Sequence, residues 1–187
     1  MPVPEAKELG PLAALVGTWE GDDGLDVSFH NETRSVEETR YRERTVFSPF
    51  GPVDNGKQCL FGLDYRMAAW RADEEDPFHT EVGYWLWDAA ARQVMRCFMV
   101  PRGSTLIAGG TVEPDATTFT LVAEVGSETY GILSNLHLAD VARTTRFECT
   151  VITGEGTFGY AETTTVDVQA FGGTLAHTDT NTLVRVD

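Results

Sequence analysis

Histidines are the residues of this sequence with the widest choice of chemistry, and the chain holds four of them. His177 lies in LAHTDTNTLVRV, residues 175–186, whose β-branched residues predict a strand close to the C-terminus. A neutral imidazole inside a pocket is a good metal ligand, whereas a lone strand histidine among threonines can equally be a surface residue. Which of these roles His177 has decides much of the function, and the residues alone leave both open.

A second histidine stands two residues before a carboxylate, in the pair His79 and Glu81. Alternate residues of a strand share one face, so Glu81 could orient the His79 imidazole, or the pair could form an interior hydrogen bond. His30 lies in a polar stretch and is expected to face solvent, and His137 lies between two leucines and is expected to pack. The sequence has no G-x-S-x-G, HExxH or phosphate-loop motif, so neither a hydrolytic nucleophile nor a phosphate site is indicated.

Three cysteines, Cys59, Cys97 and Cys149, lie far apart along the chain. Their odd number and the lack of a CxxC motif argue against a disulfide framework and against a structural zinc site. The stretch MPVPEAKELG does not show the basic segment and apolar run of a secretory signal. These features predict reduced thiols in a cytoplasmic protein.

The formal charge of −15 predicts a surface that repels phosphate backbones and anionic lipid headgroups. We therefore expect neither a nucleic-acid nor a membrane partner, and no apolar run is long enough to cross a bilayer. With 187 residues, 42% of them hydrophobic, the chain can build one sizeable core. We expect a single domain over 1–187, with 1–11 as a flexible N-terminal arm.

The elements that must position these side chains are predicted to be strands, because short runs of Val, Thr, Phe, Tyr and Trp alternate with Gly, Pro, Asn and Asp. The predicted strands lie near 17–29, 38–48, 57–71, 78–88, 93–101, 104–113, 117–126, 143–153, 157–169 and 178–186. A short helix is expected before Gly17, with loops at 49–56 and 127–142, the second of which could form a lid. This pattern predicts an all-β, ten-stranded antiparallel up-and-down β-barrel of the calycin type, wide enough for an internal ligand cavity.

Two of the predicted strands are apolar on both faces. In FHTEVGYWLW, residues 78–87, and VMRCFMV, residues 94–100, large apolar side chains occupy both alternating sets. One set would face the core or a cavity, and a partner subunit would cover the other, which favours a homodimer. A barrel filled by its own side chains and used as an interaction surface is a further alternative.

The motif GTWEG, residues 17–21, resembles the start of lipocalin-type and fatty-acid-binding barrels, in which a tryptophan closes one end under a cationic side chain of the last strand. We predict a cation–π contact between Arg185 and Trp19. The order of GTWEG, TRYRE, FHTEVGYW, LIAGGTV and GYAETTTV, followed by a last strand with a histidine, is similar to the nitrobindin family of haem-binding β-barrels. The resemblance extends from about Leu12 to Val186.

The resemblance implies a ferric haem b on a last-strand histidine, with activity on nitric oxide and isomerisation of peroxynitrite to nitrate. It makes His177 the axial iron ligand and places His79 on the other haem face, with Met95 and Met99 as apolar lining. The family's Tyr-Pro-Thr-Ile segment is replaced here by FHNETRSVEE, whose acidic groups would need a cation, Arg34 or Arg40, beside the haem propionates. This departure leaves open a fatty-acid-binding-protein-like carrier of a small hydrophobic ligand, without haem and without catalysis.

The register of the last strand decides whether His177 can bind iron. By alternation His177 shares a face with Leu183 and Arg185, and Val184 lies on the other face. If the valines face the core, His177 points outward, whereas if Arg185 closes the barrel over Trp19, His177 points inward. The histidine also lies one residue further from the terminal Leu-x-Arg pattern than the resemblance implies, and a bulge would reverse either expectation.

Overall fold

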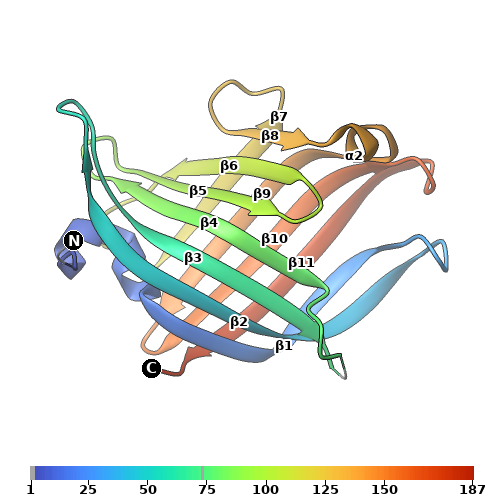
Figure 1. Cartoon of the computed structure of the whole chain (residues 1–187), viewed down its shortest axis with the longest axis horizontal. Helices are drawn as coiled ribbons and strands as arrows, with labels where there is room; N and C mark the ends of the chain where they lie inside the picture. The colour runs from blue at the N-terminus through green and yellow to red at the C-terminus, as the bar shows by residue number, and fades with distance from the viewer. Residues whose placement is uncertain (1–2, 73) are drawn as a thin grey trace.

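Segments of alternating burial, joined by tight turns, close this chain into a β-barrel (Figure 1). The computed structural model describes residues 3–72 and 74–187. The strands are β1 Gly17–His30, β2 Ser35–Asp54, β3 Cys59–Arg71, β4 His79–Asp88, β5 Gln93–Val100, β6 Ser104–Thr111, β7 Thr118–Val125, β8 Gly131–Ser134, β9 Ala142–Gly154, β10 Thr157–Val168 and β11 Gly173–Arg185. The helices are α1 Ala6–Leu9, the 3-10 helix η1 Gly10–Leu15 and α2 Leu136–Val141. None of these helices is long and apolar enough to cross a membrane.

The strand order is β1-β11-β10-β9-β7-β8-β6-β5-β4-β3-β2, and pairing of β1 with both β2 and β11 closes the ring. The predicted all-β barrel and its short N-terminal helix are confirmed, and each of the predicted strands has a counterpart. The expectation of a purely antiparallel, ten-stranded sheet is wrong because of β8, which pairs with β7 in parallel.

Strand β8 lies in the segment 127–142 that was expected to be a loop. Strands β6 and β7 pair directly only at Gly109 and Val122, and β8 fills the gap between them beyond that point. Gly109 has no Cβ, and the ring of Tyr130 occupies the space in which a Cβ would lie, 2.3 Å from the ring carbons. A strand this short has too few residues to show an alternating pattern, which explains why sequence reasoning missed it.

The second predicted loop, 49–56, is also mostly strand. Strand β2 continues to Asp54, with a register shift between Phe50 and Val53. At the shift, Gly51 has a φ of 137° and packs against Phe61, a conformation that favours glycine. Pro52 is accommodated in this bulge, because a residue without an N–H is tolerated where ladder pairing is interrupted.

The N-terminal helices cover one end of the barrel, and α2 lies at the other end (Figure 1). Leu12 and Leu15 of η1 are fully buried, and the indole N–H of Trp19 donates a hydrogen bond of 2.7 Å to the carbonyl of Leu15. The guanidinium carbon of Arg185 lies 4.8 Å from the centre of the Trp19 ring. The predicted cation–π contact is therefore confirmed, and it joins the first strand to the last where the barrel closes.

Aromatic side chains fill the half of the barrel next to the N-terminal helices α1 and η1. The ring centroid of Phe158 lies 5.9 Å from that of Trp19 and 5.7 Å from that of Phe47. Phe47 in turn lies 6.1 Å from Trp85, and all three pairs are edge-to-face, an arrangement that aromatic rings favour. This aromatic cluster closes one end of the barrel interior, and the cavity lies on its other side.

Candidate functional site

A cavity of about 640 Å³ lies inside the barrel toward α2. The usual range for small-molecule pockets is roughly 300–1,000 Å³. One wall is apolar and includes Phe98, Leu106, Ile132 and Phe147, from four different strands. Leu138 of α2 also lines the cavity, so the segment 127–142 contributes to the site through both β8 and α2.

His177 faces this cavity. Leu183, on the same face of β11, is fully buried, whereas Val184 on the other face is 53% exposed. Strands β10 and β11 pair without a register shift, so the alternation that places Arg185 over Trp19 continues back to His177. Of the two registers that the sequence allowed, the structure has the inward one.

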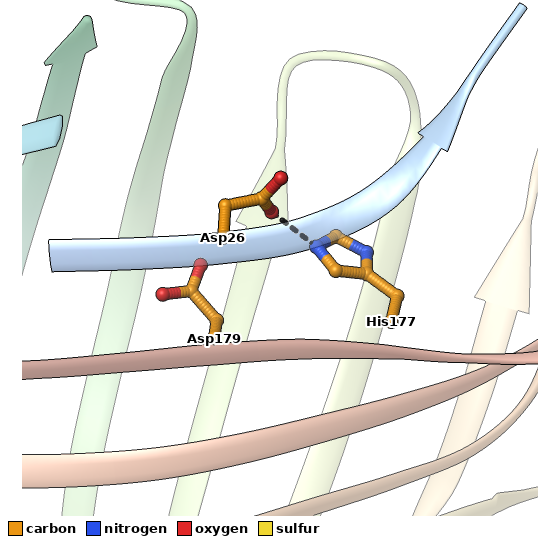
Figure 2. A group of neighbouring side chains, drawn as sticks. All are labelled: Asp26, His177 and Asp179. Carbon is orange, nitrogen blue, oxygen red and sulfur yellow. Dashed lines mark hydrogen bonds and ion pairs between the residues drawn. The ribbon is translucent and has the colours of Figure 1, made fainter. Parts of the chain in front are cut away.

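The imidazole of His177 is hydrogen-bonded through Nε2 to the buried carboxylate of Asp26, on the neighbouring strand β1 (Figure 2). Burial by itself would lower the pKa of His177, but the hydrogen bond and the charge of Asp26 outweigh it and raise the pKa above its usual value. Burial would likewise raise the pKa of Asp26, and His177 lowers it instead. The second carboxylate oxygen of Asp26 accepts a hydrogen bond of 2.6 Å from Ser28.

A second carboxylate, Asp179, lies directly opposite Asp26 across the β1–β11 pair. Each of Asp26, His177 and Asp179 offers a ligand atom, and these atoms lie within 4.8 Å of one another. Burial, reinforced by the nearby charge of Glu162, raises the pKa of Asp179 to about 7. Two carboxylates and one imidazole are thus gathered on one wall of the cavity (Figure 2).

A chain of hydrogen bonds crosses the floor of the cavity from Asp179 to Glu43. The Tyr41 hydroxyl contacts Asp179 and lies 2.8 Å from the Tyr160 hydroxyl. The Tyr160 hydroxyl in turn donates to Glu43 at 2.6 Å. Three contacts need three protons and the two hydroxyls supply only two, so one of the terminal carboxyls must hold the third. Burial raises the pKa of Glu43 as well as that of Asp179, in agreement with this count.

His79 lies on another wall, in a network centred on Arg96. His79 Nε2 is 3.2 Å from one oxygen of Glu81, and Arg96 donates to the other at 2.7 Å. Arg96 also pairs with Glu162 on β10, so this ion pair spans the barrel. Burial would lower the pKa of His79, but Glu81 raises it. The guanidinium is enclosed by aromatic rings, with Phe98 at 4.6 Å from its carbon.

Three residues that the sequence suggested for the pocket lie outside it. Met95 and Met99 are on the outer face of β5, and Met99 is 52% exposed. The inner face of this strand carries Arg96 and Phe98 instead, because two carboxylates neutralise the arginine inside the barrel. Arg40 is exposed on the outside of β2, since its neighbour Tyr41 points inward.

Cations near the mouth of the cavity come from other positions than Arg40. Arg71 at the end of β3 and Arg102 in the β5–β6 turn both line the cavity. Arg71 pairs with Glu74 at 3.1 Å and lies over the ring of Phe78 at 4.7 Å. His30, which was expected to face solvent, lines the same region.

The sequence contains a signal for Asp26 that depends on pairing the first and last strands. If Trp19 is paired with Arg185, counting along both strands places Asp26 one residue away from the position opposite Asp179. A register shift of one residue between Glu20 and Leu25 then makes the two aspartates direct partners. No comparable local signal exists for Arg96, because an arginine within an apolar run is usually assigned to the outer face.

The chain is thus an all-β closed barrel with an internal cavity, into which a histidine of its last strand points. The sequence matches the family model described as "THAP4-like, heme-binding beta-barrel domain" over residues 8–185. The chain therefore belongs to this family of haem-binding β-barrels, the nitrobindin family, as its motifs indicated.

Structural comparison agrees with the family assignment at the level of the fold. The crystal structure of Rv2717c from M. tuberculosis superposes with a TM-score of 0.70 at 18% sequence identity, and the match covers 100% of both chains. A comparison with curated proteins gave no significant match.

Proposed function

We propose that the cavity binds haem b as ferric haem through His177, and that the protein acts on nitric oxide and on peroxynitrite, which it isomerises to nitrate. The observation that carries this proposal is the orientation of the His177 imidazole into a cavity of about 640 Å³. Membership of a haem-binding family supports the choice of cofactor.

The donor set on the His177 wall fits haem iron. A metal-bound histidine usually donates its other ring N–H to a carboxylate, which fixes the tautomer and raises the basicity of the ligand. Asp26 is a carboxylate partner of this kind, because it lies in hydrogen-bond contact with the His177 imidazole. Asp26 would therefore hold the imidazole in one orientation while iron is bound.

The rest of the cavity also suits a flat apolar molecule with two acidic groups. Phe98, Leu106 and Phe147 provide an apolar wall that would pack on the macrocycle and keep water from its face. Arg71 and Arg102 at the mouth would pair with the propionates. When bound, haem iron would supply the centre at which nitrogen oxides bind and react.

Reconstitution tests the proposal directly. Haem added to the haem-free protein should give a Soret band at one haem per chain, and His177→Ala should lose it. His137→Ala, which removes an exposed histidine of α2, is the matched control and should bind haem as the wild type does. A wild-type protein without a Soret band, or an unchanged spectrum in His177→Ala, would refute the assignment. Nitric oxide binding and the rate of peroxynitrite decay would then test the activity.

The alternative function is a carrier of a small hydrophobic ligand without haem, and the apolar wall favours it. The floor of the cavity restricts the choice of ligand. Of the lysine and arginine side chains that the structure describes, only Arg96 is buried, and both Glu81 and Glu162 pair with it. A fatty-acid carboxylate would find no free cation at this floor, so a carrier of this kind would take a neutral ligand, or one whose acidic group reaches Arg71 and Arg102 at the mouth. Extraction of a neutral lipid from protein without haem absorbance would support this alternative.

A further inference from the structure

Asp26, His177 and Asp179 form a cluster with the composition of a metal site, which we call the Asp-His-Asp cluster (Figure 2). All three side chains line the cavity, and their ligand atoms lie within 4.8 Å of one another. They come from two directly paired strands, β1 and β11, so their spacing is fixed by the sheet and not by a loop.

The register of these strands places two carboxylates opposite each other. Asp26 and Asp179 are Cα partners, and both side chains point into the barrel. Like charges at opposite positions of a strand pair destabilise the sheet unless something compensates them. Two other carboxylates of the cavity, Glu81 and Glu162, have Arg96 as their cation. Among the described residues, the ion pair of the Asp-His-Asp cluster is the one between Asp26 and His177, and Asp179 contacts the Tyr41 hydroxyl.

We infer that the haem-free protein binds one divalent first-row cation of the zinc type at the Asp-His-Asp cluster, through an oxygen of each aspartate and a nitrogen of His177. Nitrogen and oxygen ligands together suit zinc and its neighbours, whereas calcium and magnesium prefer oxygen alone. Three protein ligands would leave at least one coordination position for water or a small ligand from the cavity. The cation would take the place of the proton that His177 now shares with Asp26.

This inference shares His177 with the proposed function but does not depend on haem binding. Because both metals would use the His177 imidazole and the cavity beside it, zinc and haem should compete for this site. The protein would then have two alternative forms, one with haem and one with zinc. The form that is populated would depend on which metal is available.

Isothermal titration calorimetry of zinc binding to the haem-free protein tests the inference. Cys59 is exposed and could bind zinc itself, so the titrations are made in a Cys59→Ser background. We expect one zinc per chain, and at least about tenfold weaker binding in Asp179→Asn and in His177→Ala, since loss of even an outer partner of a metal ligand costs this much. Cobalt(II), which has visible absorbance bands, should bind at the same site with the same dependence, and calcium should bind far more weakly.

Asp167→Asn is the matched control, because Asp167 is an exposed carboxylate of the neighbouring strand β10. This substitution removes the same charge as Asp179→Asn. Zinc affinity equal in Asp179→Asn and Asp167→Asn, or no zinc binding by the wild type, would overturn the inference. Asp179→Asn is nearly isosteric, and its circular dichroism spectrum would establish that it is folded. A separate haem titration distinguishes the two ideas, since zinc binding without a Soret band would refute only the proposed function, and a Soret band without zinc binding would refute only the cluster.

Discussion

Arg96 shows how a single residue organises the interior of this barrel. A buried guanidinium costs several kcal/mol in lost hydration unless partners compensate it. Here Glu81 accepts a hydrogen bond of 2.7 Å, Glu162 pairs from the opposite side, and the ring of Trp85 lies 5.2 Å from the guanidinium carbon. The ion pairs connect β5 with β4 and with β10, so they fix the shape of the cavity floor.

Removal of one of these carboxylates should be strongly destabilising. In Glu81→Gln the buried Arg96 loses a charged partner, and we expect the free energy of unfolding to fall by about 3–5 kcal/mol at pH 7. Burial would raise the pKa of Glu81, but the charge of Arg96 and the hydrogen bond from His79 lower it below its usual value of 4.5. A carboxylate with a lowered pKa contributes its stability above the unfolded-state pKa and loses it as the pH falls. The deficit of Glu81→Gln should therefore shrink below pH 4.5, as measured by urea unfolding across pH.

A surface carboxylate provides the comparison for this pH series. Glu124 pairs with Arg146 on the exposed face of β7 and β9, where ion pairs contribute about 0–1 kcal/mol. Glu124→Gln should unfold nearly as the wild type does at every pH. A similar small change in Glu81→Gln would show that the interior ion pair adds little to stability.

At the scale of elements, the motif His-x-Glu-x-Gly in β4 has a steric explanation for its glycine. A Cβ on Gly83 would lie 2.0 Å from the carbonyl oxygen of Cys97 and 2.8 Å from the Cα of Phe98. Both atoms belong to the backbone of β5, which cannot move aside as a flexible side chain could. The glycine thus lets β4 and β5 approach closely at the level of the Arg96 network.

Gly83→Ala should force β4 and β5 apart and lower the free energy of unfolding by about 1–3 kcal/mol or more. Gly159→Ala in β10 is the matched control, because its Cβ would meet no described atom closer than 3.4 Å. Thermal unfolding of both variants would test this. Equal melting temperatures would contradict the steric explanation.

The elements also show which parts of the structure the sequence could predict. Alternation located the long strands, and the pair Trp19 and Arg185 predicted how the barrel closes, because both signals are local or depend on one contact. The strand β8 was missed because its pairing depends on a gap between β6 and β7. The inner face of β5 was missed because the burial of Arg96 depends on Glu162, which is distant in sequence. His177 was found, but its orientation required the register of β11.

At the scale of the whole molecule, several exposed apolar side chains lie together on the outer surface of the barrel. The chain carries a formal charge of −15, yet one region of the outer surface is apolar. This outer patch consists of Val82, Tyr84, Met99, Ile107 and Leu133, each between 43% and 72% exposed. It is continuous, because Val82 is paired with Met99, Cys97 is paired with both Tyr84 and Ile107, and Thr105 is paired with both Met99 and Leu133.

We expect a second copy of the chain to cover this outer patch, since exposed apolar patches often mark interfaces and aromatic residues are enriched in them. Tyr84→Glu should shift the protein toward monomer in sedimentation velocity, because it would bury a charge at the centre of the interface. Val184→Glu adds the same charge to an equally exposed strand position on β11 and should leave the association unchanged. Both copies are strongly acidic, so salt should strengthen the wild-type dimer by screening their repulsion. A wild-type monomer at high concentration and high salt would show that the outer patch has another role.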